Sequence, residues 1–217
     1  AMVVMMSMLY AVFCQGQIIG TGQLGTARRS HTATLLQDGK ILIVGGDDAN
    51  GLVGPAEIFD PASLTSSNVA ANPLALRTDH TATLLSDGRV LIVGGVDSNG
   101  LLGSTEFYNP YAVPAPSFSA GPALMRARSG HSATMLSDGK ILIAGGESSG
   151  SAEIYDPATQ SFSLVSGHLN TPRQYHSAVL LNSGKVLIAG GVVGANTTLT
   201  TAEIYDPQTQ TFTPASG

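Results

Sequence analysis

The stretch HTATLLQDGK at residues 31–40 places a histidine, an acid and a base within ten residues. A histidine near a carboxylate can act as a general acid or base, and several imidazoles that converge on one point can bind a metal ion. A catalytic constellation is normally built once per chain, but this stretch recurs four times. The leading histidines of the copies are His31, His80, His131 and His176.

Each copy carries three further shared features. An arginine stands three residues before each histidine and gives RxxH: Arg28, Arg77, Arg128 and Arg173. An apolar run such as ILIV at 41–44 follows a tight turn and ends in Gly-Gly. A later phrase joins a glutamate to an aromatic residue, and its glutamates are Glu57, Glu106, Glu153 and Glu203. Self-similarity with a period of about 45 to 50 residues is typical of arrays of repeated supersecondary units.

The elements that must position these residues are β-strands. HTATLL leads through an Asp-Gly turn into an unbroken apolar run, which is typical of a β-hairpin whose second strand is buried. A third strand carries the glutamate, and a short fourth strand follows, for example QTFTP at 210–214. We name these strands A to D in chain order. Four antiparallel strands form one blade of a β-propeller, so we predict an all-β fold of four consecutive four-stranded blades.

RxxH, the apolar strand that ends in Gly-Gly, and Glu-x-Tyr-Asp-Pro together resemble the kelch repeat over residues 25–217. The resemblance implies a kelch-type propeller, like the central domain of galactose oxidase, at 18–217, with blades at about 25–75, 76–124, 125–170 and 171–217. Kelch propellers mostly have about six or seven blades, so four blades imply an incomplete ring. We therefore expect either missing blades from a longer chain or self-association, with two copies completing a ring.

The repeated polar residues are interpreted as structural. Equivalent positions of different blades lie too far apart to share one metal ion at ligand distances of about 2 Å. Each histidine is instead expected to hydrogen-bond the neighbouring blade or a loop backbone. The arginine and the glutamate start strands A and C at one edge of a blade, so Arg–Glu ion pairs are expected within or between blades. The sequence predicts no metal site and no cofactor.

The B–C and D–A connections vary in length and composition, whereas the A–B turns barely vary. In an up-and-down blade the two variable connections emerge on one face. The acids outside repeat positions all fall in these connections: Asp47, Asp48, Asp79, Asp97 and Glu147. Rigid scaffolds present binding residues on loops, so this acidic face is the predicted binding surface.

Two classes of function remain open. The first is a non-catalytic interaction module that binds a protein segment or a glycan on the variable face. The second is part of an oxidase- or epimerase-like propeller enzyme whose catalytic residues lie outside this chain. The galactose oxidase site needs a cysteine cross-linked to a tyrosine, but the single cysteine, Cys14, precedes the repeats. The unrepeated His168 has no nucleophile and carboxylate near it, so we favour the binding module and predict no enzyme activity.

Net charge and the N-terminal segment limit which partners and which location the sequence predicts. The net charge is −5, and eight of the ten basic residues occupy repeat positions. The basic stripe that nucleic-acid binding needs is therefore absent. The apolar segment at 1–17 is too short to span a bilayer, and it is either signal-peptide-like or a remnant without function. Low charge and this segment favour a secreted or cell-surface protein.

Overall fold

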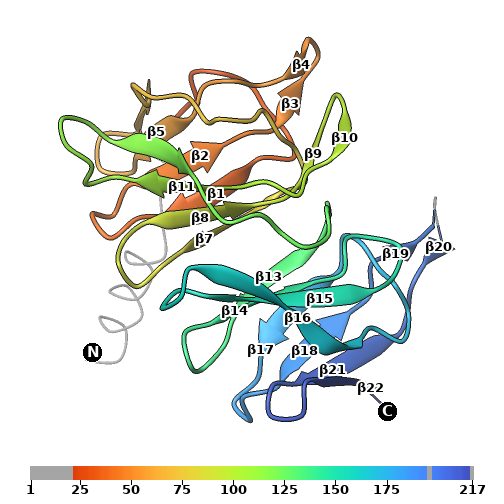
Figure 1. Cartoon of the computed structure of the whole chain (residues 1–217). Helices are drawn as coiled ribbons and strands as arrows, with labels where there is room; N and C mark the ends of the chain where they lie inside the picture. The colour runs from red at the N-terminus through yellow and green to blue at the C-terminus, as the bar shows by residue number, and fades with distance from the viewer. Residues whose placement is uncertain (1–21, 195–196, 216–217) are drawn as a thin grey trace, which may run out of the picture.

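The structure is a computed structural model that describes residues 22–194 and 197–215, and it confirms the all-β fold (Figure 1). The described residues contain no helix. Four antiparallel sheets, each a meander of strands A to D, are arranged as the four blades of a β-propeller. The predicted segment at 1–17 and the predicted start of the propeller at residue 18 lie outside the described residues.

The four blades have nearly equal strands. Blade 1 consists of β1 (Thr32–Leu35), β2 (Ile41–Val44), β5 (Glu57–Asp60) and β6 (Thr65–Asn68). Blade 2 consists of β7 (Thr81–Leu84), β8 (Val90–Val93), β11 (Thr105–Asn109) and β12 (Ser117–Ala120). Blade 3 consists of β13 (Ser132–Met135), β14 (Ile141–Ala144), β15 (Ser151–Asp156) and β16 (Ser161–His168). Blade 4 consists of β17 (Ser177–Leu180), β18 (Val186–Ala189), β21 (Ala202–Asp206) and β22 (Thr211–Pro214).

The A–B hairpins are fixed by their turn residues. In blade 1, Asp38 Oδ1 accepts a hydrogen bond from Lys40 N at 3.1 Å, and Gly39 has φ of 83°. A positive φ is accessible to glycine at little cost, which is why this turn position is glycine in every copy. The turn sets the register in which Leu35 pairs with Ile41, so both side chains lie on one face of the blade.

Three B–C connections contain a small two-stranded hairpin. The hairpins are β3 (Asp47–Asp48) with β4 (Gly51–Leu52), β9 (Val96–Asp97) with β10 (Gly100–Leu101), and β19 (Val192–Val193) with β20 (Thr197–Thr198). The first two turn at Asn-Gly, where Gly51 and Gly100 have φ of 122° and 123°. The shorter connection of blade 3 carries no such hairpin among the described residues.

The hydrophobic core lies between the blades. β2, β8 and β14 bury residues on both faces, whereas β18 buries only Val186 and Ile188. At the first interface, Leu42 of β2 faces blade 2, and Val90 of β8 faces back toward blade 1. We call the face toward the next blade the leading face and the face toward the previous blade the trailing face. The C-strand tyrosines of the trailing faces are at most 2% exposed: Tyr108, Tyr155 and Tyr205. The repeat predicts that Phe59 of blade 1, which occupies the equivalent position, also belongs to the core. It is only half-buried, because no described blade covers that trailing face.

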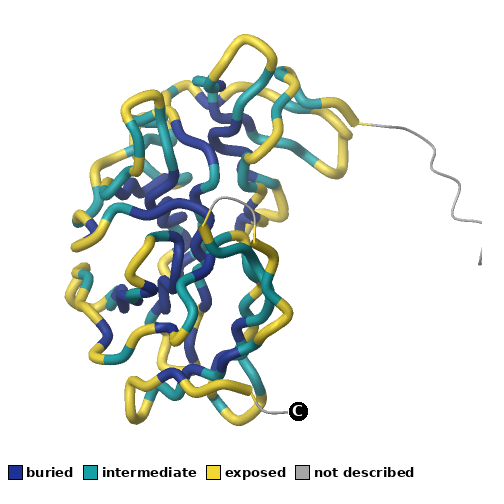
Figure 2. Tube along the Cα trace, turned by 90° about the vertical axis from the view of Figure 1, so that its right-hand side faces the viewer, coloured by how far each residue is buried: buried dark blue, intermediate teal, exposed yellow. Residues whose placement is uncertain are grey.

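The four blades form an open arc. Their inner strands pack in sequence, β1 on β7, β7 on β13 and β13 on β17. Among the described residues, β17 makes no comparable contact with β1, and blades 1 and 4 lie at opposite ends of the molecule (Figure 1). Buried segments run through the middle of the arc and exposed loops flank them (Figure 2). No helix among the described residues is long and apolar enough to cross a membrane.

Candidate binding face

Each blade contains one buried ion pair between its RxxH arginine and its strand-C glutamate, as expected. In blade 3, Arg128 Nη2 lies 2.9 Å from Glu153 Oε1, and both side chains are fully buried. The N–O distances of the other pairs are 2.5 Å for Arg28–Glu57, 2.6 Å for Arg77–Glu106 and 3.0 Å for Arg173–Glu203. All four pairs lie within a blade.

The ion pair joins the two variable connections of a blade. Arg128 Nη1 donates to Gly145 O at 2.5 Å, where the B–C connection starts. Glu153 accepts hydrogen bonds from the backbone N–H groups of Met125 and Arg126 in the D–A connection. Buried charges need such partners, because an unpaired charge in a protein interior is strongly unfavourable. The loops on this face are therefore held from below by a fixed polar network.

Hydrogen bonds of the same kind control the ionisation of Glu57. In blade 1, burial favours the neutral carboxyl of Glu57, but hydrogen bonds from Ser66 Oγ, Gly25 N and Arg28 outweigh it and lower its pKa. Glu57 is therefore ionised at neutral pH. The negative charge stays next to the arginine that it holds.

Three of the four repeated histidines join neighbouring blades. His80 Nε2 lies 2.9 Å from Thr32 Oγ1 of blade 1, and equivalent pairs are Thr81–His131 and Ser132–His176. His80 Nδ1 is buried without a hydrogen-bond partner. Burial, and the charge of Arg77, lower the pKa of His80 to about 3. These histidines are neutral and structural, and no three His, Cys, Asp or Glu side chains of the described residues are grouped to hold a metal ion.

The residue before each histidine forms what we call the inner rim, which consists of Ser30, Asp79, Gly130 and Tyr175. All four have left-handed backbones, with φ of 55°, 53°, 62° and 53° in chain order. Asp79 N donates to Ser30 O at 3.3 Å, Gly130 N to Asp79 O at 2.8 Å, and Tyr175 N to Gly130 O at 2.7 Å. One continuous series of main-chain hydrogen bonds thus crosses all four blades.

Inner-rim side chains differ in type although their backbones are alike. Tyr175 is 58% exposed, and its ring lies over Gly130, where a Cβ would stand 3.1 Å from the ring. Burial, and the negative charge of Asp79, raise the pKa of the Tyr175 hydroxyl. A left-handed backbone costs a tyrosine about 1–2 kcal/mol, and such strain is concentrated at functional sites. Asp79 and Tyr175 are therefore the first candidates for ligand contact.

The five acids predicted for binding all lie on the loop face, but most of them stabilise their own loops. Asp47 forms an ion pair with Arg29 at 2.9 Å. Asp48 and Asp97 each accept a hydrogen bond at 2.7 Å from the backbone N–H two residues later. Glu147 accepts hydrogen bonds from Ser149 N and Ser151 N. Only Asp79 belongs to the inner rim.

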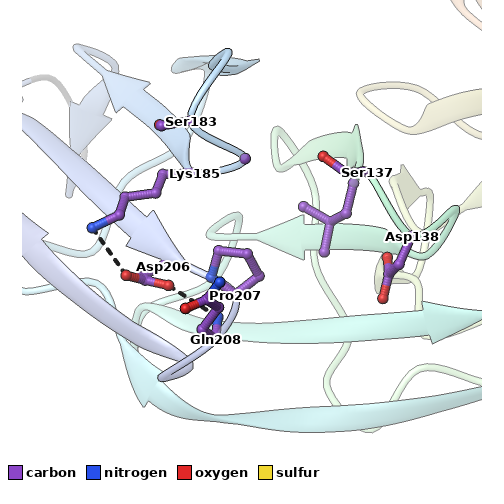
Figure 3. Close-up of a pocket in the computed structure, with 9 residues that line it drawn as sticks. Ser137, Asp138, Ser183, Lys185, Asp206, Pro207 and Gln208 are labelled. Carbon is purple, nitrogen blue, oxygen red and sulfur yellow. Dashed lines mark hydrogen bonds and ion pairs between the residues drawn. The ribbon is translucent and has the colours of Figure 1, made fainter.

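Hollows occur on both faces. An open hollow of about 520 Å³ on the loop face is lined by inner-rim residues Ser30 and Asp79 together with Arg29 and Asp47. On the opposite face, a cavity of about 340 Å³ lies between the A–B turns of blades 3 and 4 (Figure 3). There Lys185 Nζ pairs with Asp206 at 2.9 Å within blade 4 (Figure 3), and Asp138 pairs with Lys140 at 3.2 Å within blade 3.

Sequence reasoning missed Ser30 and Tyr175 as rim residues. The available signal was the third position of RxxH, which changes from copy to copy in RRSH, RTDH, RSGH and RQYH. A position that varies inside an otherwise fixed motif indicates a side chain that the scaffold does not need. The left-handed backbone that groups these residues is not visible in the sequence.

Residues 172–217, which contain blade 4, match the protein-family model described as the Kelch motif. No curated protein matches the chain at the threshold applied. The match and the four-bladed structure together support a kelch-repeat propeller. The Arg–Glu ion pair of the matched blade recurs in the other three blades, and the contact of its histidine with the preceding blade recurs in blades 2 and 3. The likeness to galactose oxidase stays a prediction.

Proposed function

We propose that this kelch-repeat propeller is a non-catalytic interaction module that binds a protein segment with a cationic side chain at its inner rim. Kelch repeats in a propeller suggest a protein-interaction module. The observation that carries the finer proposal is the exposed Tyr175 ring beside Asp79 on a left-handed, main-chain-bonded rim.

A carboxylate beside an aromatic ring suits a guanidinium or ammonium group. The carboxylate supplies the opposite charge, and the ring face attracts a cation through its quadrupole. The net charge of −5 favours cationic partners from a distance. The buried Arg–Glu pairs under the rim hold its loops in place before a ligand binds, so binding costs less conformational entropy.

The non-catalytic part of the proposal rests on the histidines. In His80, His131 and His176, one ring nitrogen is bound to a hydroxyl of the neighbouring blade and the other is buried. None of the three can exchange protons with a ligand on the loop face. A general base for catalysis would have to come from another residue.

The test measures binding to a library of peptides of one length with a central arginine. A matched peptide library with a central glutamine and a separate glycan array are measured beside it. Arginine peptides should bind, and Asp79→Asn or Tyr175→Ala should each weaken binding about 2- to 5-fold. Asp138→Asn, a carboxylate on the opposite face, is the matched control and should leave binding unchanged. Glycan binding that is indifferent to both rim variants, or binding lost in the control, would contradict the proposal.

A further inference from the structure

The three interfaces between blades share one set of contacts. Between blades 1 and 2, His80 Nε2 lies 2.9 Å from Thr32 Oγ1. The His80 ring packs on Gly45, where a Cβ would stand 2.6 Å from Cε1. Gly46 N donates to Arg77 O at 2.9 Å. At each interface the preceding blade supplies the hydroxyl and the Gly-Gly pair, and the following blade supplies the RxxH residues.

The same set recurs along the arc. Gly95 N donates to Arg128 O at 2.8 Å, and Gly146 N donates to Arg173 O at 2.9 Å. A Cβ at Gly94 or Gly145 would stand 3.0 Å or 2.9 Å from the next histidine ring. The contact set is therefore the rule by which one blade of this chain packs on the next.

The leading face of blade 4 has the same residues but lacks their partners. Gly191 N and Ser177 Oγ make no hydrogen bond to a described residue. A Cβ at Gly190 would meet only Leu199 O, at 3.7 Å. Val179 is 53% exposed, whereas the equivalent Thr134 of blade 3 is 7% exposed. The leading face of blade 4 therefore exposes the hydroxyl and the Gly-Gly pair of the contact set without the histidine and arginine residues that bind them at the other interfaces.

The trailing face of blade 1 presents the other half. Within residues 22–194 and 197–215, His31 has no hydroxyl partner of the kind that Thr32 provides for His80. Leu35 is 62% exposed, and Ile41 is partly exposed although its blade 2 equivalent, Val90, is fully buried. This face has the apolar side chains that the leading faces already bind inside the chain.

The two open faces also match in their polar positions. At the blade 1–2 interface, burial and the charge of Asp38 raise the pKa of Tyr108 to about 12. Blade 4 has Ser183 where blade 1 has Asp38, and blade 1 has Phe59 where blade 2 has Tyr108. Contact between the open faces would therefore bring together a turn with an uncharged hydroxyl and a phenyl ring without a hydroxyl.

We propose that the leading face of blade 4 binds the trailing face of blade 1 of a second copy of this chain. The contact repeats the internal set, with Ser177 Oγ bonded to His31 Nε2 and Gly191 N to Arg28 O. Two different faces take part, so the interface is heterologous, and two copies can form two such contacts. This self-association is independent of ligand binding at the inner rim.

The test uses one charged substitution on each face of the full chain. Val179→Glu changes the leading face and Leu35→Glu changes the trailing face; both side chains are more than half exposed, so both variants should fold. Leu74→Glu is the matched control, because Leu74 is 61% exposed in the D–A connection outside both faces. Light scattering across the micromolar range gives the mass, and circular dichroism checks the fold.

We expect the wild type and Leu74→Glu to associate, and Val179→Glu and Leu35→Glu to be monomers when each is alone. A mixture of the two monomeric variants should form a one-to-one complex, because one intact face remains on each chain. Val179→Lys and Leu35→Lys repeat the test if either glutamate variant loses its fold. A monomeric wild type, association that survives in either single variant, or a mixture that stays monomeric would each overturn the proposal.

Discussion

Acidification should destabilise this fold through its buried histidines before its carboxylates respond. The pKa of His80 is lowered to about 3 and that of His176 to about 4, by burial first and by neighbouring arginines second. Burial also lowers the pKa of His131 well below its ordinary value. In the unfolded chain an imidazole has a pKa of about 6.5. Below that pH the unfolded state binds more protons, so stability is complete above about pH 6.5 and falls toward pH 3.

The size of the effect follows from the width of this window. Each pH unit below 6.5 costs about 1.4 kcal/mol per histidine that stays neutral in the folded state. At pH 5, His80 and His176 therefore cost about 2 kcal/mol each, and His131 acts in the same direction. A loss of about 4 kcal/mol or more is a large part of the 5–15 kcal/mol that is typical of a folded domain.

Urea unfolding followed by far-UV circular dichroism, at several values between about pH 7.5 and pH 5, measures this loss. The carboxylates do not interfere, because the pKa values of Glu57 and Glu203 are lowered and their contributions are lost only below about pH 4.5. His176→Gln should reduce the slope of this pH dependence by about 1.4 kcal/mol per pH unit. A free energy of unfolding that changes by less than about 1 kcal/mol from pH 7.5 to 5 would refute the reasoning.

Three further predictions concern single side chains. Arg128→Met should lower the free energy of unfolding, measured in urea, by about 3–5 kcal/mol because it leaves a buried glutamate without its partner. Arg29→Met should have a much smaller effect because the Arg29 side chain is 80% exposed in its pair, and equal losses would contradict this. Tyr175→Gly should raise the free energy of unfolding by about 1 kcal/mol because it removes left-handed strain, and a destabilised variant would count against that strain. Like Tyr175→Ala, it should weaken arginine-peptide binding at the rim about 2- to 5-fold. Gly94→Ala should lower the midpoint of thermal unfolding more than Gly139→Ala does. A Cβ at Gly94 would stand 2.6 Å from Arg128 O, whereas a Cβ at Gly139 would meet no described atom within 4 Å. Equal midpoints for the two variants would exclude this steric explanation.

The sequence predicts the fold well where a residue has the same task in every copy. Arg128 and Glu153 could be paired in advance because their spacing fixes them at one edge of a blade, and four copies exclude coincidence. The strands follow from the same repetition, since a turn such as Asp38-Gly39 and a buried run leave one hairpin register.

The candidate site is harder to predict because it depends on backbone conformation and on neighbours. The left-handed φ of Asp79 and Tyr175 brings them to one rim, yet neither residue type indicates such a backbone. Asp48 was predicted to face a ligand, but its carboxylate binds its own turn, and composition cannot separate these outcomes. Phe59 was expected in the core by analogy with Tyr108, but burial depends on the presence of a preceding blade.

The main-chain hydrogen bonds of the inner rim have a consequence for how the binding surface can change. Ser30, Asp79, Gly130 and Tyr175 are held by their N–H and C=O groups, and the buried ion pairs below them use other residues. A substitution at one rim position therefore changes the binding surface but leaves the hydrogen-bonded framework unchanged. Glycine and small polar residues tolerate the left-handed backbone best, which limits the choice of substitution. Specificity can thus evolve one blade at a time, each position contributing its own side chain to a composite recognition surface.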